Sequence, residues 1–216
     1  MPNCNKCKVT RDPSYFVSKH VRRSKLTTLC SICRNTNRRS VINPTTKKGK
    51  CRAYFQKWKE KPCQNCGIKD SRLIEADHQA EFNKVHACSD YYWWACNGGV
   101  EALQAELAKC KPLCRFCHRL KTQAERKKGT QPSRLAKRKI INVEKLKRGA
   151  CSTCKRKVTL QNACAFDFDH KNPETKRLDV SQMVKKSWDY FNAHAKEEML
   201  KCVLLCVSCH KIKTHY

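Results

Sequence analysis

Cysteine pairs of the form Cys-x-x-Cys occur six times along the chain, and their spacing is the clearest pointer to chemistry. Two cysteines at this spacing can bind one side of a tetrahedral Zn²⁺ at about 2.3 Å per sulfur, and a second pair completes the site. In chain order the pairs predict three structural zinc sites. The predicted ligands are Cys4, Cys7, Cys30 and Cys33 in the first site, Cys63, Cys66, Cys114 and Cys117 in the second, and Cys151, Cys154, Cys206 and Cys209 in the third.

The remaining cysteines lack this spacing, and we interpret them as small buried apolar residues. They are Cys51, Cys88, Cys96, Cys110, Cys164 and Cys202. Disulfides in a secreted protein are disfavoured because the N-terminal sequence MPNCNKCKVT has no apolar stretch typical of a signal peptide. No apolar run has the length of a membrane span. We therefore expect an intracellular, reducing compartment (cytoplasm, nucleus or a viral setting), no secretion and no membrane partner.

An internal repeat becomes visible once the cysteines are aligned. His78 precedes Cys114 by 36 residues, and His170 precedes Cys206 by the same number. Both histidines follow an aspartate, and both stretches end in similar sequences, LCRFCHRLKT and LCVSCHKIKT. Two domains of one design are therefore predicted after an N-terminal module.

The Asp-His pair and the histidine after the last cysteine are candidates for phosphodiester hydrolysis. This reaction needs a base that activates water and a cation that neutralises charge on the phosphate. One aspartate and one histidine leave most of the shell of a Mg²⁺ or Mn²⁺ open to water and phosphate oxygens. In the second repeat we assign Asp169 and His210 as cation ligands and His170 as general base. The corresponding residues of the first repeat are Asp77, His118 and His78.

His118 and His210 each follow a predicted zinc cysteine directly, so one turn of chain would bind zinc and orient the histidine. The alternative makes each histidine an additional zinc ligand or a helix-surface residue. The catalytic interpretation is favoured because an Asp-His pair lies at the same upstream distance in both repeats. Asp167, two residues before Asp169, is interpreted as a supporting residue or as part of a hairpin.

The order Cys-x-x-Cys, Asp-His, Leu-Cys-x-x-Cys-His resembles the zinc-stapled branch of the HNH endonucleases. The second repeat, residues 151–216, matches closely, and the first, residues 63–122, matches at its anchor residues. The N-terminal segment is similar to a small zinc module that accompanies HNH domains in viral and phage proteins. The resemblance implies the same ligands and base. It also implies an α+β fold class of small zinc-stabilised modules: a zinc-ribbon-like N-terminal module and two ββα-metal domains, HNH or treble-clef-like, joined by basic helical connectors.

The two repeats depart from the HNH pattern in different degrees. The middle asparagine of the motif would fall near Lys109 and Lys201, so both repeats have lysine there. The first repeat also has EADHQAEFNK where the second has FDFDHKNPETK, and its segment YYWWACNGG is unlike anything in the second repeat. We therefore expect the second repeat to be the better catalytic candidate.

Charge indicates the partner. The chain carries 47 Lys and Arg against 18 Asp and Glu, a formal net charge of +29 at pH 7. A field of this sign over a small protein attracts polyanions, of which nucleic acid is the commonest. Basic residues gather between the modules. Residues 34–61 contain ten Lys/Arg and one acidic residue, and residues 119–148 contain twelve Lys/Arg and two acidic residues. The predicted organisation is an N-terminal zinc module (1–40), a basic connector helix (41–62), the first repeat (63–128), a second basic connector helix (129–150) and the second repeat (151–216).

The second connector predicts a basic amphipathic helix over about residues 132–148. Pro132 suits its first turn and Gly149 suits its end. Apolar residues recur at helical spacing, namely Leu135, Ile140, Val143 and Leu146. The helix either lies along phosphates or packs its apolar stripe on a neighbouring zinc module. The nucleic-acid contacts that we predict are Lys121, Lys213, Arg134, Lys137 and Arg138.

These features predict a metal-dependent HNH endonuclease that hydrolyses nucleic acid, DNA rather than RNA, with three structural Zn²⁺ ions and a catalytic Mg²⁺ or Mn²⁺. The alternative is a zinc-dependent nucleic-acid-binding protein, or part of a larger nucleoprotein assembly, whose HNH-like domains are inactive. A transcription factor that reads sequence through the N-terminal module is a third option. The enzyme is favoured because a scaffold needs only the cysteines, whereas both repeats also contain the aspartate and the two histidines.

Overall fold

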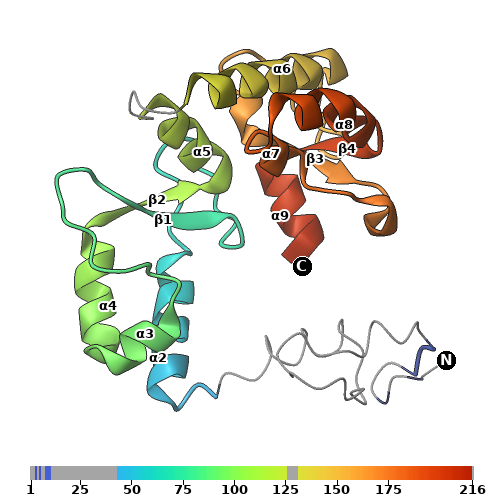
Figure 1. Ribbon diagram of the computed structural model, residues 1–216. Helices are drawn as coiled ribbons and strands as arrows, with labels where there is room; N and C mark the ends of the chain where they lie inside the picture. The colour runs from blue at the N-terminus through green and yellow to red at the C-terminus, as the bar shows by residue number, and fades with distance from the viewer. Residues whose placement is uncertain (1–2, 4, 6–7, 11–42, 126–130, 216) are drawn as a thin grey trace. The chain divides into compact units, whose positions relative to one another are not determined.

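The computed structural model of the protein describes residues 3, 5, 8–10, 43–125 and 131–215 (Figure 1). The described residues divide into two compact units, one within residues 1–55 and 87–104 and the other within residues 56–86 and 105–216. Both helices and small two-stranded sheets are present. The predicted N-terminal zinc module, with its ligands Cys4, Cys7, Cys30 and Cys33, lies outside the described residues. In the part of the chain that is described, no helix combines the length and apolar character needed to cross a membrane.

The described residues of the first unit are mainly helical from Lys47 onward, and Asn3 and Thr10 form an isolated antiparallel bridge. This unit contains parts of α2 (Lys47–Trp58) and α4 (Gly99–Ala108), and the whole of α3 (Tyr91–Cys96). Asp90 caps α3, because its carboxylate accepts a hydrogen bond from the backbone N–H of Trp93 at 3.1 Å. Trp94 is buried, and its indole Nε1 donates to the carbonyl of Ala87 at 3.0 Å. The first connector, expected over residues 41–62, therefore contains a helix that ends before Pro62.

The first repeat is built around an antiparallel hairpin and a helix in the second unit. Strand β1 (Ile74–His78) pairs with β2 (Cys110–Cys114), and α5 (Arg115–Ala124) follows β2 directly. Cys114 ends the strand and caps the helix, since its Sγ accepts a hydrogen bond from the backbone N–H of Cys117 at 3.4 Å. The same cysteine thus fixes the angle between the hairpin and the helix.

The second repeat has the same arrangement, with β3 pairing antiparallel to β4 and α9 following β4. From the strands onward, equivalent residues of the two repeats are 92 positions apart, as Cys114 and Cys206 show. His170 lies opposite Cys202 in β4, just as His78 lies opposite Cys110 in β2. The elements are η2 (Ala163–Ala165), β3 (Phe166–His170), η3 (Pro173–Thr175), α7 (Val180–Met183), α8 (Trp188–Leu200), β4 (Cys202–Cys206) and α9 (Val207–His215).

The two repeats pack against each other within the second unit. Helix α5 of the first repeat contacts both η2 and α9 of the second (Figure 1). The rings of Phe116 and Phe166 meet edge to face with centroids 5.9 Å apart, and both are buried. The guanidinium of Arg156 stacks on the ring of Phe116, 4.1 Å from its centroid. The repeats therefore share an apolar interface rather than being two independent modules.

Helix α6 (Pro132–Arg148) has the bounds expected for the second connector, and Gly149 ends it at a φ of 76°. Its buried face differs from the predicted one. The face that is buried consists of Lys137, Ile141 and Lys145, at intervals of four residues. The expected stripe is largely exposed, with Leu135 at 39%, Ile140 at 42% and Val143 at 48%. The aliphatic parts of the Lys137 and Lys145 side chains are buried on this face of the helix. A search for periodic apolar residues does not detect them, because lysine is counted as polar.

Lys137 does not present its ammonium group to a ligand. Its side chain is 3% exposed, and its Nζ donates to the carbonyl of Lys186. The same ammonium lies 4.8 Å from the ring centroid of Trp188. We therefore correct the assignment of Lys137 and leave it out of the nucleic-acid surface, while Arg134 and Arg138 of this helix are partly exposed.

Replacing Lys145 with methionine is expected to stabilise the protein at pH 7 by about 1 to 2 kcal/mol. Lys145 is 8% exposed, and burial lowers the pKa of its amine from 10.5 to about 8. Because this pKa is lower in the folded state, folding carries a cost of roughly 3 kcal/mol below pH 8 that disappears as the pH rises to 10.5. The hydrogen bond to the Ala163 carbonyl, at 3.0 Å, offsets part of this cost.

The measurement is the urea midpoint of zinc-loaded wild type and Lys145→Met at pH 7 and pH 10. The urea midpoint of the wild type should rise relative to that of Lys145→Met as the pH increases from 7 to 10. A difference between the two proteins that is the same at both pH values would contradict the proposed cost of the buried charge.

The cysteines outside the Cys-x-x-Cys pairs are only partly the buried residues that we expected. Cys51, Cys88 and Cys202 are buried, which confirms the prediction for these three. Cys96 is exposed, so the prediction is wrong there, because this residue ends the short helix α3 at the surface. Cys110 and Cys164 are partly exposed.

Candidate metal centres

The first Cys-x-x-Cys pair of each described repeat forms a tight turn. In the first repeat the N–H of Gly67 donates to the carbonyl of Cys63 at 2.8 Å, and in the second Lys155 donates to Cys151 at 3.0 Å. The residue after each pair has positive φ, 71° at Gly67 and 59° at Lys155. Lys8, which follows the first pair of the chain, has a φ of 56°. In the two described repeats, the left-handed residue after the pair lies beside cysteines whose sulfurs come together in one group.

The two described repeats each bring four cysteine sulfurs together. Within each group all four sulfurs lie within 4.8 Å of one another, and the two groups are Cys63, Cys66, Cys114 and Cys117, and Cys151, Cys154, Cys206 and Cys209. The sulfurs of Cys66 and Cys114 are 3.6 Å apart, and those of Cys154 and Cys206 are 3.7 Å apart. A disulfide needs about 2.05 Å, whereas a tetrahedron with 2.3 Å bonds has edges of about 3.8 Å. These groups therefore fit Zn²⁺ and could bind it.

The first cysteine of each repeat is prepared to lose its proton. Burial raises the pKa of Cys63, but hydrogen bonds from backbone N–H groups, including that of Cys66, outweigh it and bring the pKa to about 7. The pKa of Cys151 is lowered to about 7 for the same reasons. The pKa of Cys114 is raised to about 11, chiefly by burial. Thiolates are the form that binds zinc, and the turns stabilise one of them in each group before any metal arrives.

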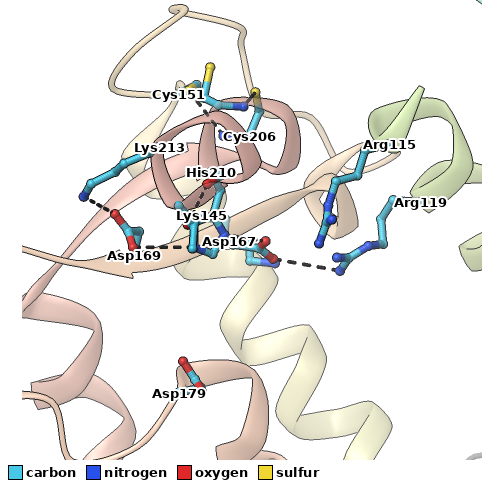
Figure 2. Close-up of polar contacts among 12 residues, drawn as sticks. Arg115, Arg119, Lys145, Cys151, Asp167, Asp169, Asp179, Cys206, His210 and Lys213 are labelled. Carbon is cyan, nitrogen blue, oxygen red and sulfur yellow. Dashed lines mark hydrogen bonds and ion pairs between the residues drawn. The ribbon is translucent and has the colours of Figure 1, made fainter. Parts of the chain in front are cut away.

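An aspartate and a histidine meet beside each cysteine group. His118 Nε2 lies 3.3 Å from Asp77 Oδ1, and His210 Nε2 lies 3.5 Å from Asp169 Oδ1 (Figure 2). The histidine comes from the first turns of α5 or α9, and the aspartate comes from the paired strand β1 or β3. Donor atoms at this separation could share one cation with bonds of about 2.1 Å. The structure thus brings together the predicted cation ligands in both repeats.

A second carboxylate orients each of these histidines. His118 Nδ1 lies 2.9 Å from Glu75 Oε2, and His210 Nδ1 lies 3.0 Å from Asp167 Oδ2. Because an ionised carboxylate can only accept, Nδ1 donates to it, which leaves Nε2, the nitrogen that faces the aspartate, as the atom that would bind a cation. Asp167 is therefore a supporting residue, as one of the sequence alternatives had it. Glu75 was missed, although its position 92 residues before Asp167 could have identified it.

The charges around these supporting carboxylates keep them ionised. Burial alone would raise the pKa of Glu75, but the hydrogen bond with His118 and the charges of Lys211 and Arg115 lower it to about 2. The pKa of Asp167 is lowered in the same way, against the effect of burial, by His210 and Arg119. In return, the hydrogen bond to Asp167 raises the pKa of His210.

A lysine contacts the second oxygen of each candidate ligand aspartate. Lys121 Nζ hydrogen bonds with Asp77 Oδ2, and Lys213 Nζ hydrogen bonds with Asp169 Oδ2. Both lysines lie one turn after the histidine, on α5 and α9. These contacts place a positive charge beside each predicted cation site, where a phosphate would also lie.

The histidines predicted as general bases lie elsewhere. His78 Nε2 is 2.8 Å from Glu106 Oε1, and His170 Nε2 is 2.8 Å from Glu198 Oε1. The side chain of His170 is 6% exposed and that of His78 is 15% exposed. Along β3 burial alternates, so His170 is turned to the buried side and Asp169 to the more exposed side.

Glu106 and Glu198 are buried residues that the sequence analysis missed. Glu198 accepts hydrogen bonds from His170, from the backbone N–H of Arg177 at 2.8 Å and from Lys201 at 3.2 Å. Glu106 has the same three kinds of partner. Both glutamates follow their histidine by 28 residues, which was the available clue. Lys109 and Lys201 thus neutralise a buried carboxylate.

Comparison of the chain with protein-family models, with curated proteins and with solved structures gives no match. What the protein does must therefore be inferred from the chemistry of these sites.

Proposed function

We propose that the protein is a metal-dependent endonuclease of the HNH type that hydrolyses phosphodiester bonds in nucleic acid, with DNA as the expected substrate. The observation that carries the proposal is the Asp–His pair found in both repeats, with Nε2 facing the aspartate and Nδ1 bonded to a second carboxylate. Zinc binding by the cysteines requires none of these residues. Their presence in two copies supports a second, catalytic cation in each repeat.

The residues of the second repeat have distinct roles in this proposal. A Mg²⁺ or Mn²⁺ held by Asp169 and His210 would neutralise charge on the phosphate and on the leaving oxygen. His170 takes a proton from water at Nδ1, because its Nε2 donates to Glu198, and Glu198 stabilises the imidazolium that forms. Lys213 contacts a phosphate oxygen from its place beside Asp169. Asp77, His118, His78 and Lys121 have the same roles in the first repeat.

The nucleic acid is held by positive charge. The net charge of +29 supports binding to phosphates without base recognition, and the partly exposed Arg134 and Arg138 add positive charge on α6. Binding of this kind weakens steeply with salt.

One observation favours a second candidate function. The side chain of His170 is almost fully buried and lies on the opposite side of the hairpin from Asp169, so it serves equally well as the partner of a buried glutamate. In this case the protein binds nucleic acid through its zinc modules and basic surface, alone or within a nucleoprotein assembly, and the repeats do not cleave.

The test is cleavage of supercoiled plasmid and of RNA by zinc-loaded protein with Mg²⁺ or Mn²⁺. We expect nicking by the wild type and its loss in the Asp77→Ala/Asp169→Ala double variant. Asp189→Ala is the matched control, because Asp189 is an exposed aspartate in the first turn of α8 and does not line the pocket of His210 and Asp167. Salt-sensitive binding without cleavage of either nucleic acid by the wild type would replace this proposal with the second candidate.

A further inference from the structure

The packing of the two repeats joins their candidate cation sites through ion pairs. Glu75 of the first repeat, which orients His118, has its Oε1 3.4 Å from the Nζ of Lys211 in the second repeat. Asp167 of the second repeat, which orients His210, has its Oδ1 3.9 Å from Nη1 of Arg119 in the first. Figure 2 shows Arg119 reaching from α5 toward Asp167.

These two contacts are equivalent to each other. Glu75 and Asp167 occupy the same position in the two repeats, since their residue numbers differ by 92. Arg119 and Lys211 are also 92 residues apart, on α5 and α9, and these two helices are in contact. One ion pair is therefore the counterpart of the other, as in a two-fold dimer whose contacts occur in reciprocal pairs.

We propose that the repeats form an internal pair in which each supplies the cation that holds the histidine-orienting carboxylate of the other. Lys211 is a positioning residue for the site of Asp77 and His118, and Arg119 is a positioning residue for the site of Asp169 and His210. This inference deepens the proposed function, since it states how the two sites depend on each other.

The physical reason is the partial burial of the two carboxylates. A carboxylate removed from water needs compensating charge and hydrogen bonds to stay ionised and fixed in place. The imidazole supplies one hydrogen bond, and the cation from the other repeat restrains the remaining oxygen. Loss of that cation lets the carboxylate rotate, and the imidazole then loses its fixed orientation and tautomer.

Each carboxylate also has one further cation nearby. Arg115, in the first repeat, gives Glu75 a partner at 3.3 Å. In the second repeat Val207 stands at the equivalent position, and the charge of Lys145 on α6 acts on Asp167 instead. We therefore expect Arg119→Gln and Lys211→Gln to have effects of similar size on the second and the first site.

The first measurement needs neither catalysis nor the second metal. The imidazole ¹⁵N shifts of zinc-loaded protein report which ring nitrogen carries the proton, and His118→Asn and His210→Asn assign the signals. We expect Arg119→Gln to shift the His210 signals toward mixed tautomers, and Lys211→Gln to do so for His118. Arg119→Lys and Lys211→Arg should restore the wild-type shifts, because they keep the charge.

The second measurement is the Mn²⁺ affinity of each site alone. In the Asp77→Ala background, Arg119→Gln should weaken binding up to about 10-fold, the lower end of the range for residues that support a metal ligand. In the Asp169→Ala background, Lys211→Gln should have a similar effect on the first site. Arg156→Gln is the control for a general loosening of the interface, since Arg156 stacks on Phe116 without contacting either carboxylate.

The outcomes separate this inference from the nuclease proposal. Crossed shifts, each substitution changing the histidine of the other repeat, support the internal pair even if the wild type cleaves no nucleic acid. Changes confined to the histidine of the mutated repeat, or equal changes with Arg156→Gln, would overturn the internal pair even if the wild type is an active nuclease.

Discussion

Replacing Cys206 with serine is expected to lower bound zinc by one ion per chain and to unfold the second repeat. Cys206 is 1% exposed, ends β4 and accepts the backbone N–H of Cys209, so it joins the zinc group to the start of α9. Binding of zinc to a four-cysteine site contributes about 10–16 kcal/mol, more than the core of a domain this small supplies. Zinc content by mass spectrometry and helix content by circular dichroism measure the two effects.

Cys96→Ser is the matched control for this experiment. Cys96 is exposed and lies outside both four-cysteine groups, so its replacement should change neither zinc content nor helix content. Removal of zinc from the wild type with a chelator should reproduce the loss of helix seen in Cys206→Ser. Unchanged zinc content in Cys206→Ser would contradict the assignment of this group as a zinc site.

Replacing His170 with alanine is expected to slow metal-dependent cleavage by about 10²- to 10⁴-fold, the range for loss of a general base. The effect is best measured in the Asp77→Ala background, where the first site is silent. His170 is held by Glu198, whose carboxylate is itself fixed by Lys201 and by the N–H of Arg177. Glu198→Gln keeps the shape of this contact but removes its charge, so a smaller loss of rate is expected.

His194→Ala serves as the control for the loss of an imidazole. His194 packs on the ring of Tyr190 in α8, with centroids 4.6 Å apart, and has no place in the proposed site. Cleavage that survives His170→Ala unchanged would show that another group activates water. The first site alone can be measured in the Asp169→Ala background and the second alone in the Asp77→Ala background. If the first site cleaved faster than the second, and His78→Ala abolished that cleavage, the ranking of the second repeat above the first would be wrong.

The metal-binding part of the site could be predicted because tetrahedral zinc imposes a strict spacing on its ligands. Cys63, Cys66 and their partners, and the equivalent group of the second repeat, come together as the Cys-x-x-Cys pairs indicated. The positions of Asp169 and His210 followed from their place relative to these cysteines. The general fold, small sheets combined with helices, is confirmed, while the HNH assignment stays a proposal.

The buried face of α6 could not be predicted from apolar periodicity. Lysine side chains have a long apolar stem, and Lys137 and Lys145 bury that stem while their ammonium groups reach backbone carbonyls. The sequence pattern predicts that both lysines are exposed to solvent. The result is that Ile141 packs inward while Ile140 and Val143, which fit the expected stripe, are exposed.

The carboxylates that support the histidines were harder to find than the ligands. Glu198 lies near the C-terminal end of α8, next to other charged residues, and its burial becomes evident once α8 is placed against β3 and β4. The ion pairs of Glu75 with Lys211 and of Asp167 with Arg119 depend on how two repeats pack, which single-sequence spacing does not encode. Internal alignment of the repeats would have marked all four positions as equivalent pairs.

Because α5 and α9 each begin directly after a zinc cysteine, insertions and deletions in their first turns would disturb the candidate cation site. One additional residue between Cys206 and His210 would rotate the imidazole by about 100° around α9, away from Asp169. In agreement, the stretch from His78 to Lys121 in the first repeat is as long as the stretch from His170 to Lys213 in the second, although the sequences differ. The four residues by which the repeats do differ in length lie between the first cysteine pair and the strand. Length changes during the divergence of the two copies were thus confined to a loop that no metal ligand depends on for its direction.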